Sequence, residues 1–410
     1  MVASIQPILI LTSNPSQFPR FGDAITFVAT ITPVGVTGTV QFIIDGIGGK
    51  YSSPVNASTG IATITISDLL IGNRFIVAMY SGDATYLPVE SSPVVGSPNS
   101  LIASFLTINQ GLTSVSIVND PISPSVFGQM VNFNVTVHPA TSTELTIPTG
   151  KVNFFVDTVG NLNNDKPVVA GIATLSIDSL SPGQHTIYGI YTGDANFASG
   201  DRRFPLVQIV SKATPTLGLT SSTTTNPSVF GQLVTFTSTI AQPFGTTFPT
   251  GTVIFVDTTT GLAIGTSSVS PLGIALITTD LLSIGSHTIN ATYSGDGNYN
   301  SILNHLVQIV TKDPTTIKIK SSVNPSKVGD LVTLTAKVKA VLPGSGIPSG
   351  IVTFTINDAI VIPITLISGK AITTFTPAMK GKQKIKAVYS GDTNFIESNT
   401  TFKQIVKKNH

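Results

Sequence analysis

The sequence contains no cysteine and no tryptophan, and only 10% of its 410 residues are charged. Without cysteine the chain has no disulfide, no thiolate nucleophile and no cysteine-based zinc or iron–sulfur site. Its apolar runs fall short of the roughly 18 residues that a membrane-spanning helix needs, and its glycines show no collagen period. Hydrophobic residues nevertheless make up 41% of the chain, too many for a disordered linker. The sequence therefore predicts a folded protein that is stabilised by hydrophobic cores alone.

The two ends of the sequence lack recognisable targeting segments. The first basic residue is Arg20, so the beginning lacks the charged region of a secretory signal peptide. The last residues include no hydrophobic tail or sorting-type segment. We expect neither a signal peptide nor a transmembrane segment in this chain, and any anchoring to be non-covalent or to lie outside it.

One unit is repeated four times. Its signature is Tyr-(Ser/Thr)-Gly-Asp, followed three residues later by Tyr or Phe, and the motif residues are Tyr80, Gly82 and Asp83; Tyr191, Gly193 and Asp194; Tyr293, Gly295 and Asp296; Tyr389, Gly391 and Asp392. A length of 410 residues suits about three average domains or four all-β modules of about 100 residues, and the repeats favour four. We predict domains at 1–103 (ending in a Pro/Ser-rich linker), 104–212, 213–312 and 313–410 (rich in lysine).

Residues with constant character alternate with variable residues before each motif. An isoleucine lies four positions before the tyrosine and a small residue two before it, as in Ile187 and Gly189, while the intervening positions vary. A period of two with one constant face indicates a half-buried antiparallel strand. Short strands separated by turn residues, with no helical period, predict all-β architecture: four tandem immunoglobulin-like β-sandwich domains. Because the second and third junctions are short, we expect an extended rod.

The repeated motif and the strand before it resemble the bacterial Ig-like repeat domains that occur in tandem in surface proteins. The segments 183–191 and 285–293 match best, and all four units match, so the resemblance covers essentially the whole chain. It implies spacers, adhesion modules or decorations of cells and virus particles, with no catalytic residues to carry over. The location that it implies is extracellular, at a cell surface or on a virion or appendage.

The recurring aspartates suggest calcium ligands, but each motif supplies only one carboxylate. A turn in which the glycine has a positive φ and the aspartate accepts hydrogen bonds from nearby amides accounts for the same residues. A second set of acids ends the Val-x-Phe strands, where we again expect a turn role: Asp45, Asp157, Asp257 and Asp358. We predict no metal site and no cofactor.

Two histidines, His185 and His287, occupy one repeat position, which holds Arg74 and Gln383 in the other copies. This exchange suggests a strand end that faces solvent rather than a catalytic base. No nucleophile, base and orienting acid can be assembled from the repeated positions. We therefore predict that the protein is not an enzyme.

Positive charge is concentrated in the last domain. Basic and acidic residues number 3 and 5, 5 and 7, 1 and 3, and 13 and 5 in the four predicted domains, so their net charges are −2, −2, −2 and +8. Many lysines of the fourth domain lie at every second position of a short segment: Lys318, Lys320, Lys337, Lys339, Lys382, Lys384 and Lys386. A period of two places each set on one exposed sheet face. These lysines either keep the domain soluble and protect its edges or dock onto an acidic surface.

Three functions are compatible with these features. The first is a non-enzymatic, surface-displayed rod that acts as a spacer or adhesive module. The second is a filament, virion or appendage subunit, in which the basic domain docks onto acidic domains of other copies. The third is a glycan-binding accessory module, for which Tyr188 is the best exposed aromatic residue. The expected partners are thus an acidic surface, a glycan or other copies of the chain; nucleic acid is not expected, because no aromatic residues are interleaved with the lysines.

Overall fold

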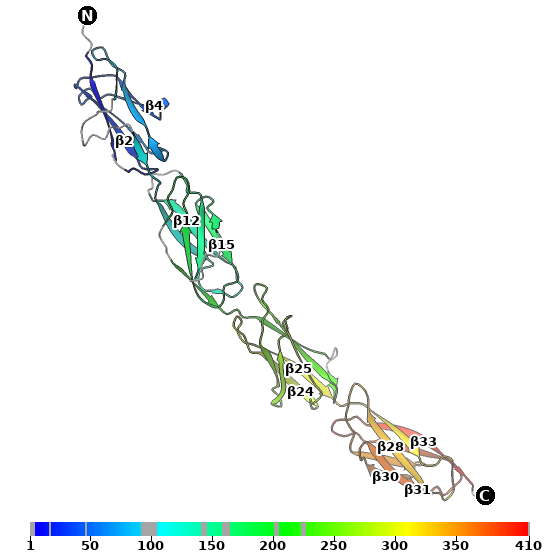
Figure 1. The fold of residues 1–410 in the computed structure, drawn as a ribbon. Coiled ribbons are helices and arrows are strands. Elements are labelled where there is room, and N and C mark those ends of the chain that lie inside the picture. The colour runs from blue at the N-terminus through cyan, green and yellow to red at the C-terminus, as the bar shows by residue number, and fades with distance from the viewer. Residues whose placement is uncertain are drawn as a thin grey trace. The chain divides into compact units, whose positions relative to one another are not determined.

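The computed structural model describes residues 5–15, 18–45, 47–91, 105–140, 146–157, 165–200, 205–222 and 227–408, and this part contains strands but no helix (Figure 1). The chain divides into two units, Met1–Ser211 and Lys212–His410, each with two of the repeats. The predicted class of four tandem Ig-like β-sandwiches is confirmed by the sheets described below; the extended rod stays a prediction. In the described residues no helix has the length and hydrophobicity for crossing a membrane.

The second repeat shows the common plan. Its strands are β10 (Thr113–Asp120), β11 (Ser125–Val126), β12 (Val131–Pro139), β13 (Lys151–Val156), β14 (Asp165–Pro167), β15 (Ile172–Ile177), β16 (Gly183–Tyr191) and β17 (Leu206–Ser211). They form a three-stranded sheet, β10-β12-β15, and a five-stranded sheet, β11-β17-β16-β13-β14. All pairs are antiparallel except β11 with β17, which is parallel. The chain thus enters the repeat in one sheet and crosses to the other at β11.

The third and fourth repeats follow the same plan. In the third, β18 (Thr216–Ser221), β20 (Val234–Ala241) and β23 (Ile274–Thr279) form one sheet, and β19 (Ser228–Val229), β25 (Ile302–Thr311), β24 (Gly285–Tyr293), β21 (Thr252–Asp257) and β22 (Leu262–Ser268) form the other. In the fourth, the sheets are β26 (Thr315–Ser321), β28 (Val332–Ala340) and β31 (Lys370–Phe375), and β27 (Ser326–Lys327), β33 (Ser398–Lys407), β32 (Gly381–Tyr389), β29 (Ile351–Ile356) and β30 (Ile360–Thr365).

The first repeat has a divided second sheet. Its strands are β1 (Ile8–Asn14), β2 (Ile25–Thr32) and β5 (Ile61–Ile66) in one sheet; β4 (Ile47–Pro54), β3 (Thr39–Ile44), β7 (Ile76–Tyr80) and β8 (Val89–Glu90) in the next; and β6 (Gly72–Arg74) with β9 (Leu106–Ile108). Strand β9 lies after residue 103, where the sequence suggested the end of this domain, yet it pairs with β6 as β17 pairs with β16. The predicted Pro/Ser-rich linker falls on residues 92–104, which lie outside the described residues.

The alternation seen in the sequence separates core from surface. In β12 the side chains of Val131, Phe133, Val135 and Val137 are buried, while the residues between them are not. Phe154 of the facing sheet is also fully buried and belongs to the same cluster. Removing an aliphatic or aromatic side chain of this size from water contributes about 1.5–3 kcal/mol. The Phe133 cluster includes one buried residue of the preceding sandwich, Phe21, so the first two sandwiches have essentially separate cores.

Candidate functional site

The Tyr-x-Gly-Asp motifs form a repeated turn. In the third repeat Gly295 has a φ of 74°, and a Cβ there would lie 2.9 Å from the backbone of Ser301 and Tyr299, so only glycine fits. The Asp296 carboxylate accepts hydrogen bonds from the amides of Asn298 and Tyr299, both at 2.8 Å, and of Thr250 at 2.7 Å. The carboxylate thus ties the turn to the loop before β21.

The same contacts recur in every repeat. The aspartates bind the following amides: Asp83 those of Thr85, Tyr86 and Thr37; Asp194 those of Asn196, Phe197 and Thr149; Asp392 those of Asn394, Phe395 and Ser349. Burial alone would raise the pKa of Asp296, but the hydrogen bonds from Thr250 and the turn amides hold it below its ordinary value. Tyr80, Tyr191, Tyr293 and Tyr389 are at most 2% exposed and fill the cores. Within the described residues, no group of three or more His, Asp or Glu is placed to hold a metal ion.

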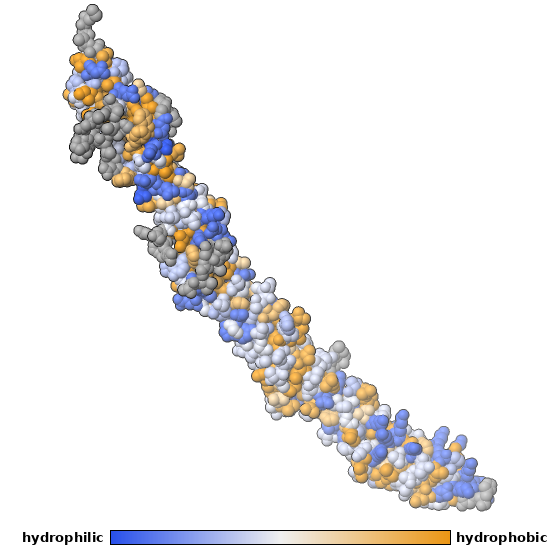
Figure 2. Space-filling view, viewed as in Figure 1, coloured by the Kyte–Doolittle hydropathy of each residue, from blue (hydrophilic) through white to orange (hydrophobic). Residues whose placement is uncertain are grey.

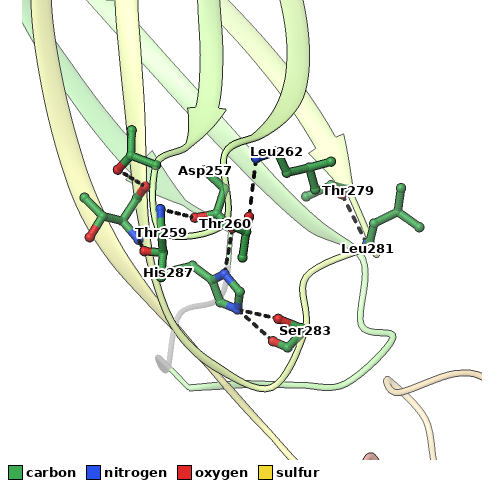
Figure 3. Close-up of polar contacts among 10 residues, drawn as sticks. Asp257, Thr259, Thr260, Leu262, Thr279, Leu281, Ser283 and His287 are labelled. Atoms are coloured by element: carbon green, nitrogen blue, oxygen red, sulfur yellow. Dashed lines mark hydrogen bonds and ion pairs between the residues drawn. The ribbon is translucent and has the colours of Figure 1, made fainter.

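A second repeated contact joins the end of one strand to the start of another, and Figure 3 shows it in the third repeat. His287, in β24, donates from Nδ1 to Asp257 Oδ2 at 2.8 Å, and its Nε2 lies 2.7 Å from the Ser283 carbonyl oxygen. Asp257 also accepts hydrogen bonds from the Thr260 hydroxyl (2.5 Å) and the Thr259 amide (3.1 Å). Burial alone would raise the pKa of Asp257, but the Thr260, His287 and Thr259 hydrogen bonds hold it below its ordinary value.

We call this contact the strand-end pair, and it has a different chemical form in different repeats. The pairs are Arg74–Asp45, His185–Asp157, His287–Asp257 and Gln383–Asn357. In each, the first residue also donates to a main-chain carbonyl three or four residues earlier. Three repeats therefore join a cation or histidine to a carboxylate, whereas the fourth joins two neutral amides.

This geometry corrects two expectations from the sequence. His185 and His287 do not face solvent: they are 8% and 2% exposed. The sequence also grouped Asp358 with Asp45, Asp157 and Asp257, but the structurally equivalent residue of the fourth repeat is Asn357, because Asn357 Oδ1 accepts the Lys384 amide as Asp157 Oδ1 accepts the Thr186 amide. The exchange of Arg, His and Gln does not reflect exposure: all of them donate an N–H to the main-chain carbonyl, and each also bonds the side chain at the strand end, as a donor in Arg74, His185 and His287 and as an acceptor in Gln383.

His185 faces two oxygen acceptors. Its Nδ1 lies 2.8 Å from Asp157 Oδ2 and its Nε2 lies 2.7 Å from the Ser181 carbonyl. Only a protonated imidazole donates from both nitrogens. Burial by itself would lower the pKa of His185, but the Ser181 carbonyl and the Asp157 carboxylate raise it above its ordinary value. Correspondingly, although burial opposes it, the hydrogen bond from His185 lowers the pKa of Asp157.

The lysines predicted from the sequence lie on two faces of the fourth repeat. Lys318 and Lys320 of β26, with Lys337 and Lys339 of β28, are exposed on the three-stranded sheet. The others, Lys382, Lys384 and Lys386 of β32, are exposed on the five-stranded sheet. There Lys384 Nζ lies 3.3 Å from Asp358 Oδ2. Figure 2 shows hydrophilic side chains projecting from the surface of this C-terminal repeat.

Tyr188, the aromatic residue that the sequence suggested for glycan binding, is less exposed than expected. Tyr188 lies in β16 at a half-buried position. The large buried aromatic residues of the described chain, by contrast, belong to the cores.

The profile of one protein family matches all four repeats. Its description is bacterial Ig-like domain (group 3), and it matches residues 11–96, 118–204, 219–311 and 319–407. The chain belongs to this family. The resemblance noted in the sequence is thereby confirmed, and no curated protein matches the chain.

Several solved structures resemble these Ig-like repeats at low identity. One is a tetra-tandem repeat in the extending region of a large adhesion protein (18% identity, 98% of this chain and 99% of that chain, TM-score 0.30). Another is the ICAM-5 D1–D4 ectodomain fragment (11%, 97% and 100%, 0.31), and a third consists of fibronectin(III)-like modules of Clostridium thermocellum CbhA (14%, 47% and 95%, 0.20). At these TM-scores they add nothing to the family assignment.

Successive Ig-like repeats within a unit meet through a pair of phenylalanines that the sequence reasoning missed. In the first unit, Phe21 packs edge-on against Phe197, the motif aromatic of the next repeat, with ring centroids 5.5 Å apart. In the second unit, Phe230 and Phe395 make the same contact at 5.7 Å. The available signal was a phenylalanine directly before the glycine that precedes the second long strand.

Hydrogen bonds reinforce both junctions. Arg20 donates to the Gln110 carbonyl at 3.0 Å, and the Gln110 side chain donates to the Asp194 carbonyl at 2.9 Å. In the second unit, Ser345 Oγ donates to the Gly231 carbonyl at 2.7 Å. Each junction therefore combines an edge-to-face aromatic pair, worth about 0.5–1.5 kcal/mol beyond its area, with polar contacts.

Proposed function

We propose that the chain is a non-enzymatic structural module, displayed at a bacterial surface, that acts as a spacer or adhesive segment. Membership of the bacterial Ig-like family supports a structural role. The observation that carries the proposal is the recurrence of one junction: the Phe21–Phe197 and Phe230–Phe395 pairs use equivalent positions in two different units. A contact that recurs in this way restricts the angle between neighbouring repeats, which a spacer requires.

Small-angle X-ray scattering of the full chain tests the spacer role. Four domains joined end to end would span on the order of 150 Å, and a rod of that length has a radius of gyration of about 43 Å. A compact chain of the same length would have a radius of gyration of about 22 Å. We expect a value near the larger figure, and Phe230→Ala should broaden the distance distribution. A value near the smaller figure would contradict the spacer role.

The self-assembly alternative has less support from the contacts. It requires acidic groups in the first three repeats that are free to meet the basic repeat of another copy. Three of their carboxylates are instead paired with an arginine or histidine of the same repeat: Asp45, Asp157 and Asp257. A virion or appendage setting stays a prediction.

A further inference from the structure

The three-stranded sheet of the fourth repeat carries a row of lysines in register. Lys318 lies opposite Lys337, and Lys337 lies opposite Lys370 on the other side. Since neighbouring strands are about 4.8 Å apart, these three lysines form one row across the whole sheet. Lys320 and Lys339 extend from the same face. These five exposed residues are called the lysine face: Lys318, Lys320, Lys337, Lys339 and Lys370.

Among the described residues, no acidic side chain forms an ion pair with the lysine face. The acids of the fourth repeat are Asp313, Asp330, Asp358, Asp392 and Glu397, and none of them belongs to β26, β28 or β31. Within residues 313–408, all of which the structure describes, the ion pair joins Lys384 to Asp358, on the other sheet. Like charges that are directly opposite each other in a sheet destabilise it. The row is therefore not explained by stability.

The equivalent positions in the three-stranded sheets of the other repeats hold no charged residue. Pairing across their three-stranded sheets identifies the equivalent residues as Ile10, Thr30 and Ile61; Ser116, Thr136 and Ile172; Gly218, Thr239 and Ile274. All nine are uncharged. The same sandwich is thus built three times without these lysines, so solubility of the fold does not require them.

A hollow adjoins the lysine face at one end. It has a volume of about 270 Å³, and its lining includes Lys337, Lys339, Ser368 and Gly369. The residues that line this recess thus include two lysines of the lysine face and a serine, and it can receive a polar group of a ligand.

We propose that the lysine face binds a linear acidic polysaccharide. Its five positive charges lack counter-charges, and Thr316, Thr335 and Ser368 supply hydroxyls close to them for hydrogen bonding. Nucleic acid fits less well, because β26, β28 and β31 present no aromatic side chain for base stacking except Phe375, which is half-buried. A bilayer fits less well too, since Ile372 is the one large apolar residue exposed on this face. The inference rests on the proposed adhesive role and names the chemistry of its partner.

The test is binding of the full chain to polygalacturonate and dextran sulfate, with neutral dextran as a control polymer, measured by biolayer interferometry at low and high salt. The test variant combines K318Q, K337Q and K370Q. The matched control combines K382Q, K386Q and K403Q, exposed positions of the other sheet in the same repeat, and changes the net charge equally. We expect the test variant to weaken binding to the acidic polymers by at least about tenfold, and the control by far less.

Other outcomes would overturn the proposal. Equal losses in the two variants would mean that net charge alone attracts the polymer. No binding to either acidic polymer would exclude the partner but leave the scattering result, and hence the spacer role, unaffected. Tighter binding to single-stranded oligonucleotides or to vesicles of anionic phospholipid would identify a different partner. Thermal unfolding shows that the test variant folds, and the removal of facing charges should raise its melting temperature by about 1–3 °C.

Discussion

The strand-end pair of the second repeat offers a test of why Arg, His and Gln exchange at one position. His185→Gln alone would leave the Asp157 carboxylate facing a weaker, neutral donor, and Asp157→Asn alone would leave a protonated imidazole facing an amide. Hydrogen bonds to charged groups contribute about 1.5–3 kcal/mol. Because the Asp157 side chain is 37% exposed, water screens part of the effect, and we expect each single change to cost about 1.5 kcal/mol.

The double substitution should recover most of this loss. It would recreate the neutral pair of the fourth repeat, in which Asn357 Nδ2 donates to Gln383 Oε1 and Gln383 Nε2 donates to the Met379 carbonyl at 3.1 Å. We expect the double variant to lie within about 1 kcal/mol of the parent, which requires a coupling energy of about 2 kcal/mol between the two sites.

Hydrogen exchange measured by mass spectrometry on the full chain resolves these differences repeat by repeat. Peptides from β16 report the local free energy of opening, and peptides from β32 serve as an internal control that should not change. If the double variant lost as much stability as the two single variants added together, the two residues would not act as a pair, and the reasoning would be refuted.

Three further predictions concern pH, burial and a junction. Because its pKa is raised, His185 stabilises the second repeat below about pH 6.5, and this stabilisation is lost as the pH rises through the raised pKa. Asp157, whose pKa is lowered, stabilises the repeat above about pH 4. His185→Arg should remove the loss of stability at alkaline pH, as measured by calorimetry. Asp313 is fully buried, no cation pairs with it in the described chain, and burial raises its pKa although the Val341 amide opposes the shift. Asp313→Ala should therefore stabilise the fourth repeat by about 1–3 kcal/mol at pH 7 and much less near pH 4, and unchanged exchange rates in β32 would contradict this. Phe230→Ala should speed amide exchange around Phe395 while leaving β24 unchanged, and an effect on β24 instead would place Phe230 in the core of its own repeat.

The sequence predicts the sheets well because burial and repetition coincide. Phe133 and Ile187 are inward in the alternation and fully buried in the sandwich. The motif turn is also readable, since the left-handed Gly193 and the Asp194 acceptor are both local to the chain. Strand alternation and tight turns can be predicted because the residues that form them are close together in the sequence.

Contacts between distant strands are harder to predict. His185 meets Asp157 28 residues away, so its burial depends on which strands become neighbours. The lysines show the same limit: alternation predicts exposed faces, but only the pairing of β26, β28 and β31 aligns Lys318 and Lys337 with Lys370, which the alternating sets had not included. Register is a tertiary property, and one sequence without its fold does not determine it.

The parallel pairing of β11 with β17 has a mechanical consequence. Ser125 and Val126 lie near the beginning of their repeat and pair with Val210 and Ser211 at its end. When tension pulls the two ends of such a repeat apart, these strands slide along each other, and the hydrogen bonds between them must rupture together rather than one after another. The same short parallel pair closes the third and fourth repeats, through β19 with β25 and β27 with β33. Each of these sandwiches is therefore loaded in shear, the direction in which a β-sheet withstands force best.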